Sequence, residues 1–234
     1  MKKTFNKKLF PEFALEVVEI LSAEFPDSYF VGGAVRNILL NKKIVDVDIA
    51  TSAKPAQVVR LLKLQGIECL TEHQKLGVIT ASSRSAKNKP QNLEITTFRK
   101  ETYTHKSRFP KVVFVKSALV DSARRDFTVN ALYYSPISKQ LLDFHNGLTD
   151  LAERKLNFIG NAKKRITEDP LRIVRAFKFS MQYNLQIDKK TLQLLQTNLI
   201  LIKKVSKVRV QKEINSVASQ KIRKQLQKVI HSMP

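Results

Sequence analysis

The sequence predicts a mixed α/β domain at residues 1–149, followed by an all-helical domain at residues 150–234. Two observations predict this organisation. Apolar residues switch between helical spacing and every-second-residue spacing through residue 145, whereas after Asp143 only the helical spacing remains. The chain of 234 residues is also 43% apolar, which is enough to bury a core.

The elements expected in the first domain follow one another along the chain. Phe13, Val17 and Leu21 recur at helical spacing, so an amphipathic helix is expected within residues 9–25. A short strand is expected at 29–31. Further helices are expected at 34–40 and 55–64, and further strands at 44–50, 77–82, 93–98, 112–115 and 128–134. Two loops are expected, a polar hairpin tip at 87–91 and a basic loop at 103–111.

The second domain is expected to consist of helices joined by short polar segments. These helices are expected at 151–154, 170–183, 189–197 and 207–229. Pro170 suits the first turn of its helix, where the missing N–H costs no hydrogen bond.

The chain is unusually basic, with 42 lysines and arginines against 20 aspartates and glutamates and a net charge of +22. Such a charge attracts polyanions, with nucleic acid first and an acidic membrane surface second. The sequence contains no run of eighteen apolar residues, and glutamates interrupt the stretch that a signal peptide would need. The single cysteine, Cys69, fits a reducing compartment. We therefore expect a cytoplasmic protein with no membrane partner.

Two glycines and two aspartates form the first candidate site. Gly32 and Gly33 lie between a predicted strand and a predicted helix, where the backbone can approach a phosphate, and Arg36 follows one turn later. Asp46 and Asp48 are expected on one face of the next strand, because residues i and i+2 point the same way. Two adjacent carboxylates suit Mg²⁺. A tight turn and a solvated strand face are the alternative interpretations.

Further polar residues extend this candidate site. Glu94, on another alternating strand, is a candidate third carboxylate, or it points to solvent. Arg124 and Arg125 suit a triphosphate because guanidinium groups pair well with phosphate oxygens. Asp126 or Asn130 suits the hydroxyls of a ribose. A solvated charge run is the alternative interpretation of the two arginines.

A separate candidate site is the charged face of the helix predicted from Pro170. At about 100° per residue, Glu168, Asp169, Arg172 and Arg175 fall on one narrow side, opposite the apolar residues. An Asp beside an Arg can offer a nucleobase one acceptor and a planar set of donors. Surface ion pairing is the alternative, because Glu168 and Arg172 are spaced i, i+4.

In this order, the motifs resemble those of the class II nucleotidyltransferases, the family of tRNA CCA-adding enzymes and bacterial poly(A) polymerases. The resemblance runs from about Tyr29 to Glu213. The stretches that carry it are Gly32–Arg36 with Asp46–Asp48, Arg124–Ala131, Asp143 with Gly147 and Asp150, Glu168–Arg175, and Val208–Glu213.

The resemblance implies a polymerase-β-like head with a mixed sheet and an all-α neck. Asp46 and Asp48 would be the catalytic residues and would hold two Mg²⁺ ions, with CTP and ATP as substrates. The nucleotide-binding residues that it implies are Gly32, Gly33, Arg36, Arg125, Asp126, Asn130, Asp169, Arg172 and Arg175. The supporting residues are Glu168, which would orient Arg172, together with Arg124, Arg209 and Glu213.

The sequence also departs from the family pattern. Asn37 stands where an Asp is usual, Lys178 stands where many members have an arginine, and the basic loop lacks a common Asp-Gly pair. Relatives also continue much further beyond Glu213. We expect basic residues near the predicted site to contact RNA; they are Arg99, Lys106, Arg108, Lys203, Lys204, Lys207, Lys221, Arg223 and Lys224.

The function predicted from these features is template-independent addition of CMP and AMP, from CTP and ATP, to the 3′ end of tRNA with release of pyrophosphate. A poly(A) polymerase, or an enzyme that adds only CC or only A, would share the same motifs. Two alternatives belong to a different functional class. A catalytically silent RNA-binding module or a subunit of a split enzyme would have the same excess of positive charge.

Overall fold

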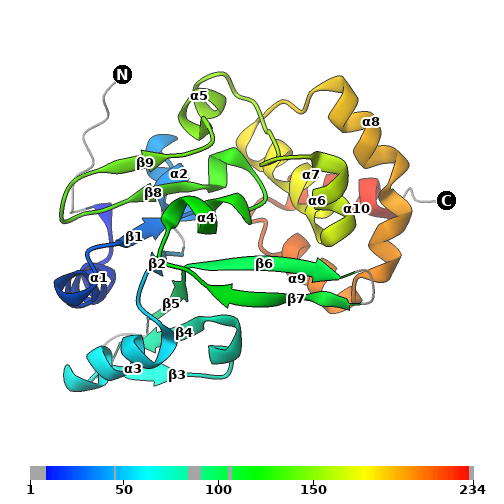
Figure 1. Ribbon diagram of the computed structural model, residues 1–234. Helices are drawn as coiled ribbons and strands as arrows, with labels where there is room; N and C mark the ends of the chain where they lie inside the picture. Colours follow the sequence, from blue (N-terminus) through cyan, green and yellow to red (C-terminus); the bar gives the residue numbers. More distant parts are fainter. Residues whose placement is uncertain (1–8, 45, 84–90, 105–106, 232–234) are drawn as a thin grey trace. The chain divides into compact units, whose positions relative to one another are not determined.

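The computed structural model describes residues 9–44, 46–83, 91–104 and 107–231, with the backbone alone at residues 104, 107–109 and 231 (Figure 1). The chain forms two compact units that interleave along the sequence. The sheet unit comprises Met1–Thr102, Pro110–Arg125 and Asn130–His145, and the helical unit comprises Tyr103–Phe109, Asp126–Val129 and Asn146–Pro234. The predicted boundary between residues 149 and 150 stays a prediction.

The sheet unit is built on a seven-stranded mixed sheet in the order β3-β4-β5-β2-β1-β8-β9. Its strands are β1 (Ser28–Val31), β2 (Asp48–Thr51), β3 (Glu68–Leu70), β4 (Val78–Ser82), β5 (Asn92–Thr97), β8 (Leu132–Tyr134) and β9 (Leu141–Asp143). Strands β2 and β5 are parallel, and the other neighbouring pairs are antiparallel. A separate two-stranded sheet pairs β6 (Arg99–Thr104) with β7 (Ser107–Phe114). The mixed sheet followed by helices agrees with the predicted fold class.

Helices complete both units. The sheet unit contains α1 (Glu12–Glu24), α2 (Gly33–Leu39), α3 (Pro55–Leu64), α4 (Ala118–Ala123) and the 3-10 helix η2 (Gln74–Leu76). The helical unit contains α5 (Gly147–Ala152), α6 (Ala162–Glu168), α7 (Leu171–Tyr183), α8 (Lys189–Thr197), η4 (Leu199–Lys204), α9 (Lys207–Asn215) and α10 (Gln220–His231). One more 3-10 helix, η3 (Thr128–Asn130), precedes β8.

Each unit has its own aromatic core. In the sheet unit, α1 buries Val17 and Leu21, as its helical spacing predicts, and packs against β1 and α3. The rings of Tyr29, Phe98 and Tyr133 also pack together in this unit, with centroids 6.0–6.4 Å apart. In the helical unit, the ring of Phe127 lies 4.7 Å from that of Phe158 and 5.7 Å from that of Phe179. These aromatic pairs fix the segments from which the candidate site residues project.

The prediction of a strand at 44–50 is wrong for the first half of that range. Strand β2 begins only at Asp48, because its neighbour β1 ends opposite it at Val31. The next residue, Gly32, has φ +66° and turns the chain away into α2. Without a neighbouring strand, Asp46 precedes β2 as irregular chain.

Two further expectations are wrong in part. The strand expected at 128–134 begins as the 3-10 helix η3, because the Thr128 N–H bonds to the Asn157 carbonyl and the Thr128 hydroxyl to Asp150. The basic loop expected at 103–111 belongs largely to β6 and β7, whose backbones pair with each other. Most of the predicted hairpin tip at 87–91 lies outside the described residues.

The long helix expected at 207–229 is two helices, α9 and α10. Residues 216–219 interrupt it, and the guanidinium of Arg223 donates to the Val217 carbonyl at 2.7 Å and to the Asn215 carbonyl at 3.3 Å. An arginine that binds these carbonyls stabilises the end of α9.

Candidate functional site

Of the two predicted catalytic aspartates, Asp48 begins β2 and Asp46 lies two residues before it. Val47 between them is buried, whereas Asp46 is exposed and Asp48 is half-buried. This alternation agrees with two carboxylates on the side opposite Val47. Asp48 is in register with Glu94 of the parallel strand β5, so the exposed Glu94 side chain lies on the same face of the sheet.

The described residues contain no group of three or more His, Cys, Asp or Glu side chains placed to hold one metal ion. The role of Glu94 as a third carboxylate stays a prediction. Two carboxylates still form a suitable partial shell for Mg²⁺, which usually keeps several waters and takes further oxygens from substrate phosphates.

The turn at Gly32 brings the backbone close to the Asp48 carboxylate. A Cβ atom on Gly32 would lie 3.6 Å from Arg125 Nη1 and 3.8 Å from Asp48 Oδ2. The positive φ of Gly32 is unfavourable for residues with a side chain. Gly32 therefore lies against one cation and one carboxylate of the predicted site. The next residue, Gly33, lies in the same way against Arg36, with Arg36 Nη2 3.6 Å from a Cβ on Gly33.

Arg36 is 4% exposed and binds two asparagines. It donates to Asn130 Oδ1 and, at 3.1 Å, to Asn37 Oδ1. Asn37 in turn donates to the Lys43 carbonyl at 3.0 Å. The Asn37 amide thus accepts a hydrogen bond from Arg36 but brings no negative charge to it.

Arg125 is held by a buried cluster around Asp121. Arg125 Nε donates to the Tyr133 hydroxyl at 2.8 Å, and that hydroxyl donates to Asp121 Oδ2 at 2.6 Å. Arg124 Nε donates to Asp121 Oδ1, also at 2.8 Å. Burial alone would raise the pKa of Asp121, but Arg125 and Arg124 lower it below its usual value. The Asp121 carboxylate thus stays ionised and positions both arginines.

In the helical unit, the predicted single charged face is divided between two helices. Helix α6 ends at Glu168 and α7 begins at Leu171. Asp169 between them is extended, with φ −145° and ψ +100°, as expected for a residue that precedes a proline. The helical-wheel grouping of Glu168 and Asp169 with Arg172 is therefore wrong.

The expected contact between Glu168 and Arg172 nevertheless forms. Glu168 Oε2 accepts from Arg172 Nη1 at 3.0 Å and from Arg165 Nη1 at 2.6 Å. Arg172 is 6% exposed, it also donates to the Arg165 carbonyl at 2.7 Å, and its guanidinium lies 5.9 Å from the centre of the Tyr103 ring. Asp169 accepts from the Leu171 N–H at 3.2 Å and from Arg209 at 3.0 Å. Both residues predicted to read a base are thus held in fixed positions.

Arg175 connects two acidic residues of the helical unit. It donates to Asp126 Oδ2 at 2.7 Å and to Glu213 Oε1 at 2.8 Å, and Glu213 also pairs with Lys178. Burial would raise the pKa of Glu213, but Arg175 and Lys178 lower it below its usual value. Burial lowers the pKa of Lys178 despite the attraction of Glu213. In this structure Arg175 therefore also serves to tie Asp126 to α9.

Sequence reasoning missed several residues that hold the predicted ones. Asp121 could have been found, because it lies three and four residues before Arg124 and Arg125 on one helical turn. Arg165 lies three residues before Glu168, so its ion pair with Glu168 could have been found in the same way. Nothing in the sequence indicates that Tyr133 binds Arg125 or that Tyr103 approaches Arg172.

The residues expected to contact RNA differ in their surroundings. Lys106 and the side chain of Arg108 lie outside the described residues. The Arg99 guanidinium is engaged with Glu101 at 2.8 Å and with the Leu76 carbonyl, and Arg223 binds backbone carbonyls. The remaining side chains are exposed; they are Lys203, Lys204, Lys207, Lys221 and Lys224. In the described part of the chain, none of the helices is long and apolar enough to span a bilayer.

A match that covers most of the sheet unit identifies the family of the chain. The family model described as "Poly A polymerase head domain" matches residues 28–157, more than half of the chain. The chain belongs to this family. The matched range includes β1, β2 and the segment from Arg124 to Asn130 on which the candidate site was predicted.

Relatives and solved structures agree with this assignment. The chain is 39% identical to the CCA-adding enzyme of Lactococcus lactis subsp. cremoris over 90% of its own length and 52% of that protein. It is 37% identical to the CCA-adding enzyme of Enterococcus faecalis, over 90% of its own length and 49% of that protein. The chain thus spans about half the length of the curated relatives that it matches.

Two solved structures resemble the chain closely. The Bacillus stearothermophilus CCA-adding enzyme in complex with CTP is 31% identical with a TM-score of 0.75, covering 87% of this chain and 47% of that one. A tRNA nucleotidyltransferase complexed with a primer tRNA and an incoming ATP analog is 26% identical with a TM-score of 0.69, covering 92% of this chain and 59% of that one. The resemblance to the class II nucleotidyltransferases is confirmed.

Proposed function

We propose that the chain carries the nucleotidyl-transfer centre of a CCA-adding enzyme, which adds CMP and AMP from CTP and ATP to the 3′ end of tRNA. The relatives and the two complexes described above, with CTP and with primer tRNA and an ATP analog, support this choice. The single cysteine agrees with a reducing compartment, so the proposal locates the reaction in the cytoplasm.

The observation that carries the proposal is the pairing of Asp48 and Arg125 around Gly32. A carboxylate and a guanidinium lie within 4 Å of the same Cβ position, which the glycine leaves open. The guanidinium suits the phosphates of an incoming nucleotide, and the carboxylate suits a cation that accompanies them. Asp46, two residues earlier and exposed, supplies the second carboxylate.

Each residue then has a defined task. Asp46 and Asp48 would hold Mg²⁺, since their four carboxylate oxygens match its preference for oxygen ligands. When bound, the metal would lower the pKa of the attacking RNA hydroxyl and stabilise the leaving pyrophosphate. Arg125 would bind the triphosphate, its orientation fixed by Tyr133 and Asp121. Arg172 and Asp169 would select the base.

The test compares purified Asp46→Ala and Asp48→Ala with the unmodified protein on three tRNA substrates, ending without CCA, in C, or in CC. Each nucleotide is supplied separately and the 3′ ends are sequenced. Either variant should lose at least about a hundredfold in incorporation, because a group that stabilises developing charge is removed. Glu16→Ala, at an exposed acid of α1, is the matched control. Incorporation that persists in both aspartate variants would reject the mechanism.

A poly(A) polymerase is the second candidate, because the matching family model carries that name. The same sequencing experiment separates the two activities. A CCA-adding enzyme stops after one A on tRNA ending in CC, whereas a poly(A) polymerase adds long A tails to generic RNA. Addition of only CC or only A would indicate an enzyme of partial specificity.

A further inference from the structure

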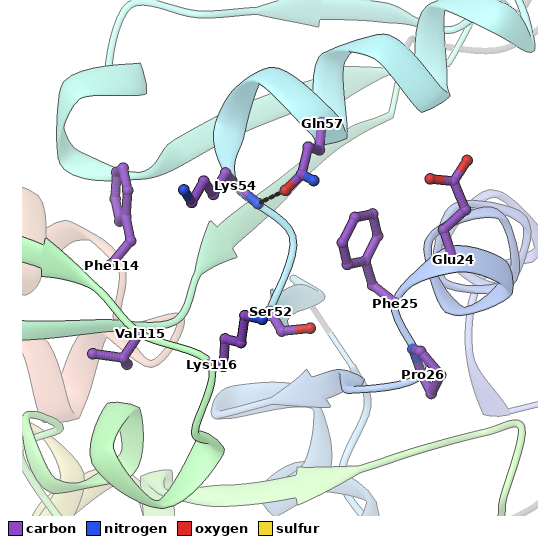
Figure 2. A pocket seen from close by; sticks show the side chains of 9 residues that line it. All are labelled: Glu24, Phe25, Pro26, Ser52, Lys54, Gln57, Phe114, Val115 and Lys116. Carbon is purple, nitrogen blue, oxygen red and sulfur yellow. Dashed lines mark hydrogen bonds between the residues drawn. The ribbon is translucent and has the colours of Figure 1, made fainter.

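A pocket lies in the sheet unit, at the opposite end of β2 from the aspartates (Figure 2). Its volume is about 670 Å³, within the range of pockets that hold small ligands. The turn after α1, the turn from β2 into α3, and the chain that follows β7 form its walls. Asp48 begins β2 and Ser52 follows its last residue, so roughly 13 Å of extended chain separate the carboxylate from the pocket.

The charged groups of the pocket favour an anion. The side chains of Lys54 and Lys116 line it, and both residues are exposed. The one acidic residue of the lining, Glu24, pairs with Arg60 at 2.6 Å, so its negative charge is balanced by a neighbour. Ser52 and Gln57 add polar groups, although Gln57 Oε1 already accepts from the Lys54 N–H at 2.8 Å. The pocket is therefore net positive.

Two aromatic rings stand on either side of Lys54 in Figure 2. Phe25 follows α1 and is half-buried, and its ring lines the pocket. Phe114 ends β7, and its ring lies close to Gly77, where a Cβ would be only 2.7 Å from the ring. Lysines combined with aromatic faces are typical of sites that bind single-stranded nucleic acid, where bases stack and phosphates pair with cations.

We propose that this pocket binds one nucleotide of the RNA substrate, with its phosphodiester at Lys54 and Lys116 and its base against Phe25. Two lysines are enough to neutralise the single negative charge of one phosphodiester, whereas a free triphosphate carries more negative charges than two lysines can neutralise. The choice of RNA rests on the proposed function. The pocket would then anchor the RNA away from its reacting 3′ end, at a position distinct from the carboxylates of β2.

The test measures direct binding of tRNA lacking its CCA end, by fluorescence anisotropy and without nucleotides, so that it does not depend on catalysis. Lys54→Ala/Lys116→Ala is compared with Lys63→Ala/Lys75→Ala, which removes the same charge from exposed lysines of the same unit. The pocket variant should bind about tenfold more weakly than this control. The slope of log affinity against log salt should fall by about 0.7 for each phosphate that the variant no longer binds. Phe25→Ala should also weaken binding, by about fivefold or more, because the base would no longer stack on a ring.

The outcomes separate this inference from the proposed function. Equal affinities and equal salt slopes for the two double variants would overturn the pocket assignment while leaving the Asp48 test untouched. A raised KM for CTP with unchanged RNA affinity would indicate a free-nucleotide site and would also overturn it. If Asp48→Ala remains active but the pocket variant loses RNA affinity, the proposed chemistry fails and the RNA pocket stands.

Discussion

The two groups of predicted site residues differ in how the protein surrounds their acidic groups. In the sheet unit, Asp46 is exposed and Asp48 half-buried at the start of a strand. In the helical unit, Glu168 and Glu213 each pair with two cationic side chains. The first arrangement leaves carboxylates accessible from solvent, and the second uses carboxylates to fix arginines. Acidic side chains are therefore accessible at Asp46 and Asp48, whereas Glu168 and Glu213, like the buried Asp121 of the sheet unit, hold cationic side chains.

The sharpest test of this comparison is Glu213→Ala. Removing this carboxylate leaves the mostly buried Lys178 and the neighbouring Arg175 without their shared partner on α9. We expect the free energy of unfolding to fall by about 3 kcal/mol, because an uncompensated buried charge is costly. Urea denaturation measures this change, with Glu16→Ala as the exposed control. A loss below about 1 kcal/mol would show that Glu213 is not a structural anchor.

A second test replaces the buried Arg172 by lysine. Lysine keeps the charge but cannot reproduce the planar hydrogen bonding of the guanidinium with Glu168 and the Arg165 carbonyl. We expect the preference for CTP over UTP, measured as the ratio of kcat/KM values, to fall about tenfold, in the range that a few altered interactions produce. Arg165→Lys, which shares Glu168, is the matched control. An unchanged preference in Arg172→Lys would remove its proposed role in base selection.

Low pH should lower the free energy of unfolding in both units, because each contains a buried carboxylate that is paired with cations. The pKa values of Asp121 and Glu213 are lowered by neighbouring cations, so the unfolded chain takes up protons at a higher pH than the folded protein does. Their stabilisation is full above the ordinary carboxyl pKa of about 4 and is lost as the pH falls below it. Unfolding measured from pH 6 to pH 3 should show this decline, by about 1 kcal/mol or more. In Asp121→Asn, the free energy of unfolding should fall less between pH 6 and pH 3. A pH dependence identical to that of the unmodified protein would contradict this cause.

The smallest effect is expected at the exposed aspartate. Asp46→Ala should change the free energy of unfolding by less than about 0.5 kcal/mol, because its side chain is solvated. The same denaturation assay measures it beside Glu213→Ala. A large loss of stability at Asp46 would mean that both acidic groups are structural, and the comparison between the units would fail.

Much of the fold could be predicted from local patterns. Helices α3 and α8 have the predicted bounds, since each begins with a strong start signal, Pro55 in α3 and the Asp188 cap in α8. Helices α4 and α6 and strands β3, β6 and β9 were missed. Strands of three residues such as β3 and β9 show too little alternation to be recognised. Their pairing with neighbouring strands, which periodicity does not show, defines them.

The sequence by itself determined the motifs and their order, the excess of positive charge, and the alternation that separates Asp46 and Asp48 from the buried Val47. These depend on residue type and near neighbours. Only the tertiary structure decided that Tyr133 holds Arg125, that Glu213 reaches Arg175 and Lys178, and that Gly32 lies against Asp48. Those interactions join residues far apart in the chain, and their formation depends on how strands and helices pack, which no local pattern encodes.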